Sequence, residues 1–345
     1  MTRITQNCSP KYMRRAYVSA IELLEFNLSV NIYILDEYNN TLEVHYTIFS
    51  TKKDKANVSD YQNIIRFYLY TRNKPHDSVQ LRIGDTDSLR LGQFDPKIPT
   101  IFVTHGWSNS HQSQSCIYVR DAYLQHGEYN VILIDWSAVS MGTYASVTSQ
   151  VVPVSQYIAR MIDFLGTQGV DSSNITVIGH SVGAHIAGLS SYYAKKKANY
   201  VVGLDPSAPY FYNKSRDSQI SKYDATYVQV IHTSSVAGIS DRIGDVDFYV
   251  DGALQQNGCY NIELCSHWRA YEYFAESVKS GGFLARRCNN FFDYELGKCE
   301  SNDVAYMGGA VLDHNAKGAY YLTVNAKPPF ARNNPDALKN DTTEV

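Results

Sequence analysis

Apolar runs alternate with helical patterns along the chain from about residue 63 onward. Six runs, several of them continuously apolar, have the length and β-branched content of strands covered on both faces: residues 64–70, 100–106, 130–136, 175–179, 200–205 and 227–232. A last strand is predicted at residues 319–324, and helical stripes are predicted at residues 155–169 and 267–281. This alternation predicts an α/β fold, with a mostly parallel sheet and helices on both faces.

One stretch, "NITVIGHSVGAHIAGL" at residues 174–189, changes from a strand pattern to a helix pattern through a serine between two glycines. A turn too tight for side chains at Gly179 and Gly183 would expose the Ser181 hydroxyl. The G-x-S-x-G pattern alone arises by chance in roughly one chain in ten of this length. The flanking strand and helix therefore carry the prediction of a nucleophile elbow.

A serine nucleophile needs a base, and the base needs an acid that holds its tautomer. Asp205 ends the strand after the elbow, at the edge where parallel strands gather polar side chains, and is the predicted acid. Its alternative role is a turn or capping residue before Pro206. Of the ten histidines, His267 and His314 come late enough to serve as the base, and spacing alone leaves both open.

Three other histidines, His105, His180 and His185, are interpreted as bracing the turn through hydrogen bonds. Acyl transfer also needs backbone N–H donors for the oxyanion. Val182 follows the candidate nucleophile, and Trp107 follows the strand exit "VTHG", although a His-Gly pair is also an ordinary strand exit.

Composition places few limits on the partner. The 345 residues are enough for one large α/β domain, and 44% hydrophobic content indicates a folded chain. A formal net charge of −3 gives no basic excess, so we do not expect nucleic acid as a partner.

Cysteines and glycosylation triplets point to export. Six cysteines are an even number, and Cys259/Cys265 and Cys288/Cys299 are close enough to close one loop each. Neither pair has zinc-site spacing. Seven N-x-S/T triplets agree with a secreted glycoprotein: Asn7, Asn27, Asn39, Asn57, Asn174, Asn213 and Asn340.

These stretches together resemble the pancreatic lipase family, more closely its insect branch and the short-lid venom phospholipases A1. The matching stretches follow the family's order over residues 63–330: "FVTHGW", "VILIDWS", "NITVIGHSVGAHIAG", "VGLDPSAPYF", "DATYVQVIHTSS", "VDFYVDG", "CSHWRAYEYFAES" and "GAYYLTVNAKPPF". The resemblance implies an α/β-hydrolase domain without the C-terminal β-sandwich. It implies Ser181, Asp205 and His267 as the triad, in preference to His314, with the Trp107 and Val182 amides as the oxyanion hole.

The resemblance also implies disulfides Cys259–Cys265 and Cys288–Cys299, which leaves Cys8 as the remaining partner for Cys116. The family's calcium-site acids are mostly missing before Asp224, so no metal or other cofactor is expected. No colipase partner is expected, and the protein is predicted to be a monomer.

Three segments are expected along the chain. Residues 1–60 are a disordered leader, a pro-region or an incorrectly assigned start, because Glu22, Glu25 and Asn27 interrupt what would be the apolar part of a signal peptide. The same polar residues argue against a membrane span. Residues 61–330 are the catalytic domain, and residues 331–345 are a mobile tail.

Two short loops bear on the substrate. Only five residues, "YNIEL", separate Cys259 from Cys265, and the loop at residues 234–245 has twelve. An open site of this kind favours a phospholipid over a bulky neutral lipid. We therefore expect a secreted phospholipase A1 that shows no rate jump at a lipid interface. The alternatives are a triacylglycerol lipase or galactolipase of digestive type, and a non-catalytic lipid-binding protein like the yolk proteins.

Overall fold

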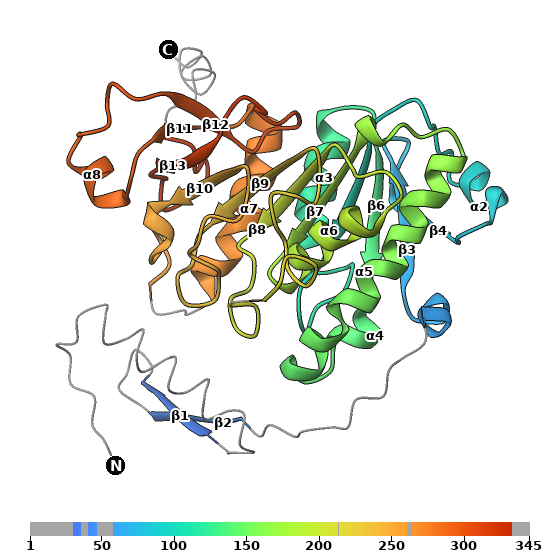
Figure 1. The fold of residues 1–345 in the computed structure, drawn as a ribbon, viewed down its shortest axis with the longest axis horizontal. Helices are drawn as coiled ribbons and strands as arrows, with labels where there is room; N and C mark the ends of the chain where they lie inside the picture. Colours follow the sequence, from blue (N-terminus) through green and yellow to red (C-terminus); the bar gives the residue numbers. More distant parts are fainter. Residues whose placement is uncertain (1–29, 36–40, 47–57, 213, 261–263, 333–345) are drawn as a thin grey trace, which may run out of the picture. The chain divides into compact units, whose positions relative to one another are not determined.

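The computed structural model describes residues 30–35, 41–46, 58–212, 214–260 and 264–332 (Figure 1). The chain divides into two compact units, Met1–Lys55 and Ala56–Val345. In the first unit, strands β1 (Val30–Leu35) and β2 (Thr41–Tyr46) pair antiparallel, with Val30 opposite Tyr46.

The second unit is built on one large sheet. Its order in the described residues is β12-β11-β13-β10-β9-β8-β7-β5-β6-β3-β4. The strands from β6 to β13 in this order run parallel, and both edges are antiparallel. Their bounds are β3 (Arg66–Thr71), β4 (Lys74–Leu81), β5 (Thr100–Thr104), β6 (Asn130–Asp135), β7 (Ile175–His180), β8 (Tyr200–Leu204), β9 (Tyr227–His232), β10 (Val246–Val250), β11 (Phe283–Arg287), β12 (Val304–Met307) and β13 (Gly318–Leu322).

Helices cover both faces of this sheet. The bounds are α2 (Thr86–Leu91), α3 (Gln114–His126), α4 (Ser137–Ser140), α5 (Tyr144–Thr167), α6 (Val182–Tyr193), α7 (Cys265–Ser280) and α8 (Phe291–Glu295), with 3-10 turns η1 (Val58–Asn63), η2 (Ser172–Asn174) and η3 (Asp251–Ala253). Helices α5 and α6 pack on one face, and α3 and α7 pack on the other. The mostly parallel, doubly covered sheet predicted from the sequence is confirmed.

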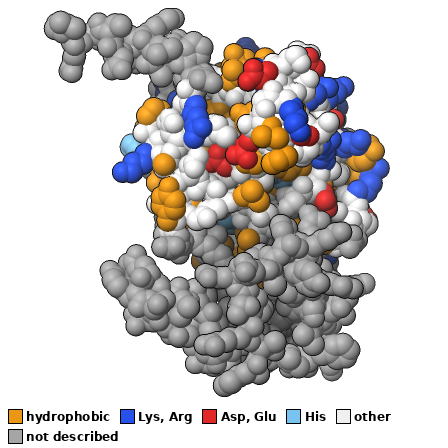
Figure 2. All heavy atoms as spheres, turned by 90° about the vertical axis from the view of Figure 1, so that its left-hand side faces the viewer, with side chains coloured by type: hydrophobic (Ala, Val, Ile, Leu, Met, Phe, Trp, Pro, Cys, Tyr) orange, Lys and Arg blue, Asp and Glu red, His pale blue; other side chains and the backbone are white. Residues whose placement is uncertain are grey.

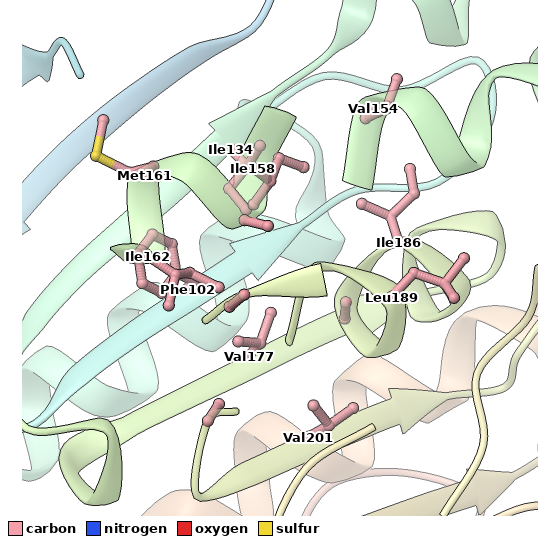
Figure 3. Close-up of a cluster of buried hydrophobic side chains, with 14 of the residues drawn as sticks. Phe102, Ile134, Val154, Ile158, Met161, Ile162, Val177, Ile186, Leu189 and Val201 are labelled. Carbon is pink, nitrogen blue, oxygen red and sulfur yellow. The ribbon is translucent and has the colours of Figure 1, made fainter. Parts of the chain in front are cut away.

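The core between the sheet and α5 and α6 explains why the strands are continuously apolar. Phe102, Val177 and Val201 project from β5, β7 and β8 toward Ile158 of α5 and Ile186 of α6 (Figure 3). All five side chains are fully buried. Burial of one such aliphatic or aromatic side chain contributes about 1.5–3 kcal/mol, so this layer is a major source of stability.

The sequence patterns missed some elements for identifiable reasons. Helix α5 begins at Tyr144, whereas the sequence pattern predicted a helix only from residue 155. Pro153 lies inside the helix, and proline usually marks a helix boundary in a sequence. The half before Pro153 still buries Val147 and Val151. The edge strands β4, β11 and β12 were not predicted, since their residues are largely exposed or too few to show alternation.

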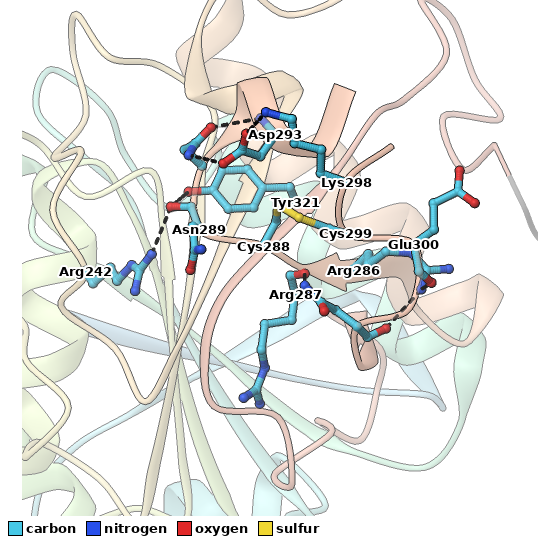
Figure 4. Close-up of a disulfide and its surroundings, with 12 residues drawn as sticks. Arg242, Arg286, Arg287, Cys288, Asn289, Asp293, Lys298, Cys299, Glu300 and Tyr321 are labelled. Atoms are coloured by element: carbon cyan, nitrogen blue, oxygen red, sulfur yellow. Dashed lines mark hydrogen bonds and ion pairs between the residues drawn. A yellow bond between two sulfur atoms is a disulfide. The ribbon is translucent and has the colours of Figure 1, made fainter. Parts of the chain in front are cut away.

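Both disulfides implied by the resemblance, Cys259–Cys265 and Cys288–Cys299, are present. The second joins the end of β11 to the segment after α8 and packs under Tyr321 of β13 (Figure 4). Cys116 is buried and bonded to none of the described cysteines, and its expected partner Cys8 lies outside the described residues.

Figure 2 shows the side of the molecule that carries α8, where acidic, basic and apolar side chains are interspersed.

The helices in the described ranges include none with the length and apolar character that crossing a membrane requires.

Candidate active site

Ser181 occupies the turn between β7 and α6 in a conformation that non-glycine residues rarely adopt, with φ 60° and ψ −127°. A Cβ at Gly179 would lie 2.0 Å from Gly183 O, and one at Gly183 would lie 2.3 Å from His105 O. Only glycine fits either position, so the turn is as tight as the sequence predicted. The Ser181 side chain is partly exposed and forms no hydrogen bond within the described part of the chain.

Asp205 follows β8 and is fully buried. Its Oδ2 accepts a hydrogen bond from His267 Nδ1 at 2.5 Å, and its Oδ1 accepts from the Thr233 and Ser234 amides at 2.8 and 3.0 Å. With its proton on Nδ1, the imidazole presents an unprotonated Nε2. That atom can accept a proton from a hydroxyl, which is what a general base for a serine requires.

His267 lies in the first turn of α7, directly after the Cys259–Cys265 disulfide. Its carbonyl oxygen accepts a hydrogen bond from His180 Nε2 at 2.9 Å, and the two rings are 4.5 Å apart. Burial lowers the pKa of His180 well below its usual value, so this ring is neutral. Because His180 immediately precedes Ser181, it ties the candidate base to the elbow.

The exit from β5 runs directly past the serine. A Cβ at Gly106 would lie 3.4 Å from Ser181 Oγ. The amides of Trp107 and Val182 donate to no other residue among those described, so both can donate to a ligand atom. The structure thus brings both predicted oxyanion donors beside Ser181.

His105 fixes the direction of one of these donors. Its Nδ1 donates to Gly106 O at 2.9 Å, and its Nε2 accepts from the Trp136 amide at 3.2 Å. Burial lowers the pKa of His105, which keeps the ring neutral, although Asp135 Oδ1 lies 3.5 Å from Nε2. Since Gly106 C=O and Trp107 N–H belong to one planar trans peptide, anchoring the first orients the second in the opposite direction.

Apolar side chains are exposed on the loops that follow the carboxyl ends of the strands. The exposed residues on these loops include Trp107, Met141, Val236, Leu254, Tyr260 and Leu264, and Trp268 is exposed in the first turn of α7. They lie on the same edge of the sheet as Ser181, Asp205 and His267. Exposed apolar side chains therefore flank the site on several sides.

The remaining candidates lie elsewhere or serve other roles. His314 is exposed in the turn before β13, at the amino edge of the sheet, and is not part of the site. His185 braces the loop after Asp205, because it donates to Ser207 O and accepts from Ile220 N. No group of three or more His, Cys, Asp or Glu residues that could bind a metal occurs within the described ranges. The sequence pattern did not predict that the Thr233 and Ser234 amides bind the Asp205 carboxylate.

Comparison with known proteins identifies the family. The family model described as "Lipase" matches residues 29–330, and so begins within the segment expected to precede the domain. The chain is 30% identical to Phospholipase A1 2 of Vespa affinis over 304 residues, 82% of this chain and 90% of that protein. It is 32% identical to Phospholipase A1 of Vespa crabro over 252 residues, 68% of this chain and 84% of that protein.

A solved esterase of Pyrococcus furiosus, Pf2001, shares 14% identity with the chain at a TM-score of 0.31, over 79% of this chain and 84% of that one. The fold assignment rests on the strand order and the family match. The chain belongs to the Lipase family and is a carboxylic ester hydrolase with an α/β-hydrolase fold.

Proposed function

We propose that this protein is a secreted phospholipase A1 that releases the sn-1 fatty acid from phospholipids through a Ser-His-Asp acyl-enzyme mechanism. The observation that carries the proposal is the 2.5 Å bond between buried Asp205 and His267, beside a strained and accessible Ser181. The relatives that the chain matches over most of their length are named phospholipase A1, which supports the same reaction.

In this mechanism Ser181 Oγ attacks the acyl carbonyl carbon while His267 Nε2 takes the hydroxyl proton. The Trp107 and Val182 amides stabilise the oxyanion of the tetrahedral intermediate. When the intermediate collapses, the ester C–O bond breaks and His267 returns the proton to the departing lysophospholipid oxygen. Water, deprotonated by His267, then hydrolyses the acyl-enzyme and regenerates Ser181.

Two loops support a phospholipid rather than a triglyceride as the substrate. The Cys259–Cys265 loop contains only five residues. The loop at residues 234–245 is held down by hydrogen bonds from Ala208 N to Ala237 O and from Ile239 N to Pro206 O, both at 2.8 Å. Both loops are too short to fold over Ser181, and a site without a long lid suits a charged head group.

The protein acts as a monomer at a membrane or micelle surface, without colipase. The exposed apolar side chains on the loops around Ser181 support contact with lipid. The two disulfides support an oxidising, extracellular location.

Hydrolysis of micellar phosphatidylcholine should be compared with hydrolysis of emulsified long-chain triglyceride, over concentrations that span monomer to aggregate. A phosphatidylcholine with different acyl chains at sn-1 and sn-2 identifies the ester that is cleaved. The proposal expects release of the sn-1 chain, no sudden rise in rate at the interface, and no activity in Ser181→Ala. A preference for triglyceride that appears only at an interface would favour a neutral lipase, and an inactive wild-type protein would favour a lipid-binding role.

A further inference from the structure

Buried histidines report their protonation through their partners, because a neutral imidazole has one donor nitrogen and one acceptor nitrogen. Three buried histidines of the described residues, His105, His180 and His185, have one nitrogen that donates to a carbonyl. In His105 and His185 the other nitrogen accepts from an amide, and in His180 it has no partner. Burial lowers the pKa of all three, in His185 to about 3, in agreement with neutral rings.

His232, at the end of β9, is arranged differently. It is fully buried, with Nδ1 2.7 Å from Ile239 O and Nε2 2.9 Å from Asp247 Oδ1. A carbonyl oxygen can only accept. Asp247 Oδ1 also accepts from the Ile243 and Gly244 amides at 3.1 and 3.3 Å, so this oxygen is an acceptor and not the oxygen of an O–H group. Both ring nitrogens therefore face acceptors, and both must carry hydrogen.

We propose that His232 is a buried imidazolium, paired with the Asp247 carboxylate, and that it is a positioning residue that holds the turn at residues 234–239 against Asp205. Among the described residues, Asp247 is the carboxylate within ion-pair distance of this ring. The Tyr249 ring stacks on the imidazole at 4.5 Å and 8° and covers one face of it. Its hydroxyl donates to Ser240 O, and burial raises the pKa of Tyr249, so Tyr249 stays neutral.

The turn matters because it encloses the candidate acid. His232 precedes Thr233, whose amide donates to Asp205 Oδ1, and the Nδ1 bond of His232 anchors Ile239 at the far end of the turn. Between them, a Cβ at Gly238 would lie 2.4 Å from Asp205 Oδ1. One protonated ring thus fixes both ends of the segment that excludes water from Asp205. Exclusion of water from Asp205 lowers the local dielectric constant, which strengthens the hydrogen bond between its carboxylate and His267.

The test combines a spectroscopic and a kinetic measurement on the full chain. Ring-nitrogen NMR of 15N-histidine-labelled protein near neutral pH should show two protonated nitrogens for His232 and one each for His105, His180 and His185. Loss of its signals in His232→Gln assigns them. Asp247→Asn keeps the side-chain shape but removes the negative charge that stabilises the imidazolium, and should convert His232 to the neutral form with one protonated nitrogen.

With a short-chain chromogenic ester, Asp247→Asn should lower kcat about tenfold and change KM by less than about twofold, as expected when catalytic groups shift slightly. His126→Gln, at an exposed position at the end of α3, is the matched surface control and should leave both constants unchanged.

A single protonated nitrogen on His232 in the wild-type protein, or full kcat in a folded Asp247→Asn variant, would overturn the inference. The NMR result does not depend on activity. The kinetic measurement rests on the proposed triad but not on the preference for phospholipid. A wrong inference about His232 therefore appears in the NMR spectra and the ester kinetics, whereas a wrong substrate proposal appears only in the lipid assays.

Discussion

The Asp205 carboxylate lies directly against the backbone of Gly238. A Cβ built at Gly238 would be 2.4 Å from Oδ1 and 2.7 Å from Oδ2, distances that real Cβ contacts do not reach. Asp205 is fully buried and bonded to His267 through Oδ2, so it cannot move aside without disturbing that bond. Position 238, in the loop after β9, is therefore restricted to glycine by the candidate acid itself.

Gly238→Ala should lower kcat by at least about tenfold, because a small displacement of a catalytic group has large kinetic effects. Gly166→Ala is the matched control, since Gly166 lies in α5 and a Cβ there would meet nothing within 4 Å. It should keep full activity and stabilise the protein by about 0.5–1 kcal/mol in urea unfolding. Full activity in Gly238→Ala would show that Asp205 tolerates displacement.

His105→Phe tests the orientation of the Trp107 amide. Phenylalanine keeps an aromatic ring against Trp136, which stacks on His105 at 5.0 Å and 6°, but removes the donor to Gly106 O. We expect kcat to fall roughly 10- to 100-fold with KM little changed, as when an oxyanion donor is weakened. His105→Asn carries a donor near the position of Nδ1 and should recover part of the loss. Equal kcat values in the Phe and Asn variants would exclude this role for the hydrogen bond.

Tryptophan fluorescence reports on contact with lipid. Trp107 and Trp268 are 38% and 41% exposed beside the candidate triad, whereas Trp136 is fully buried. Adding phosphatidylcholine vesicles to Ser181→Ala protein, which cannot consume them, should shift the emission to shorter wavelength as the two indoles enter the interface. Trp107→Phe combined with Trp268→Phe should abolish the shift. A shift that persists in this double variant would place the lipid contact elsewhere.

Asp224 should make stability depend on pH. Burial raises the pKa of its carboxyl from 3.8 to about 6. The pKa is higher in the folded state than in the unfolded state, so protonated Asp224 favours the folded state. The free energy of unfolding is therefore highest below about pH 4 and falls by up to about 3 kcal/mol as the pH rises through about 6. Urea unfolding of wild type and Asp224→Asn should therefore differ in pH dependence over this range. Identical pH dependence would contradict the raised pKa.

Local sequence predicted the elbow because its requirements are local. Gly179 and Gly183 flank Ser181 within five residues, and a Cβ at Gly179 would collide with the backbone of Gly183 in the same turn. The restriction at Gly183 is tertiary, because a Cβ there would collide with His105 O after β5. Asp205 was predicted because it ends the next parallel strand, and such ends share one edge of the sheet.

The choice between His267 and His314 could not be made from spacing. His267 lies 62 residues from Asp205 in the chain, and it reaches the carboxyl edge only because α7 begins there. His314 precedes β13 and lies at the opposite edge. The amides that hold Asp205 carry no residue-type signal, because any residue except proline supplies an N–H. Gly238 likewise contacts Asp205 only through the tertiary path of its loop.

We propose that the hydrogen-bonded pair of Asp205 and His267 activates Ser181 as a nucleophile. Labelling with a serine-directed fluorophosphonate, followed by peptide mass spectrometry, tests it without knowledge of the substrate. We expect one phosphonyl group per chain, located on Ser181, absent in Ser181→Ala and formed far more slowly in His267→Ala and Asp205→Asn. Folded wild-type protein that stays unlabelled, or that is labelled on a different serine, would contradict it.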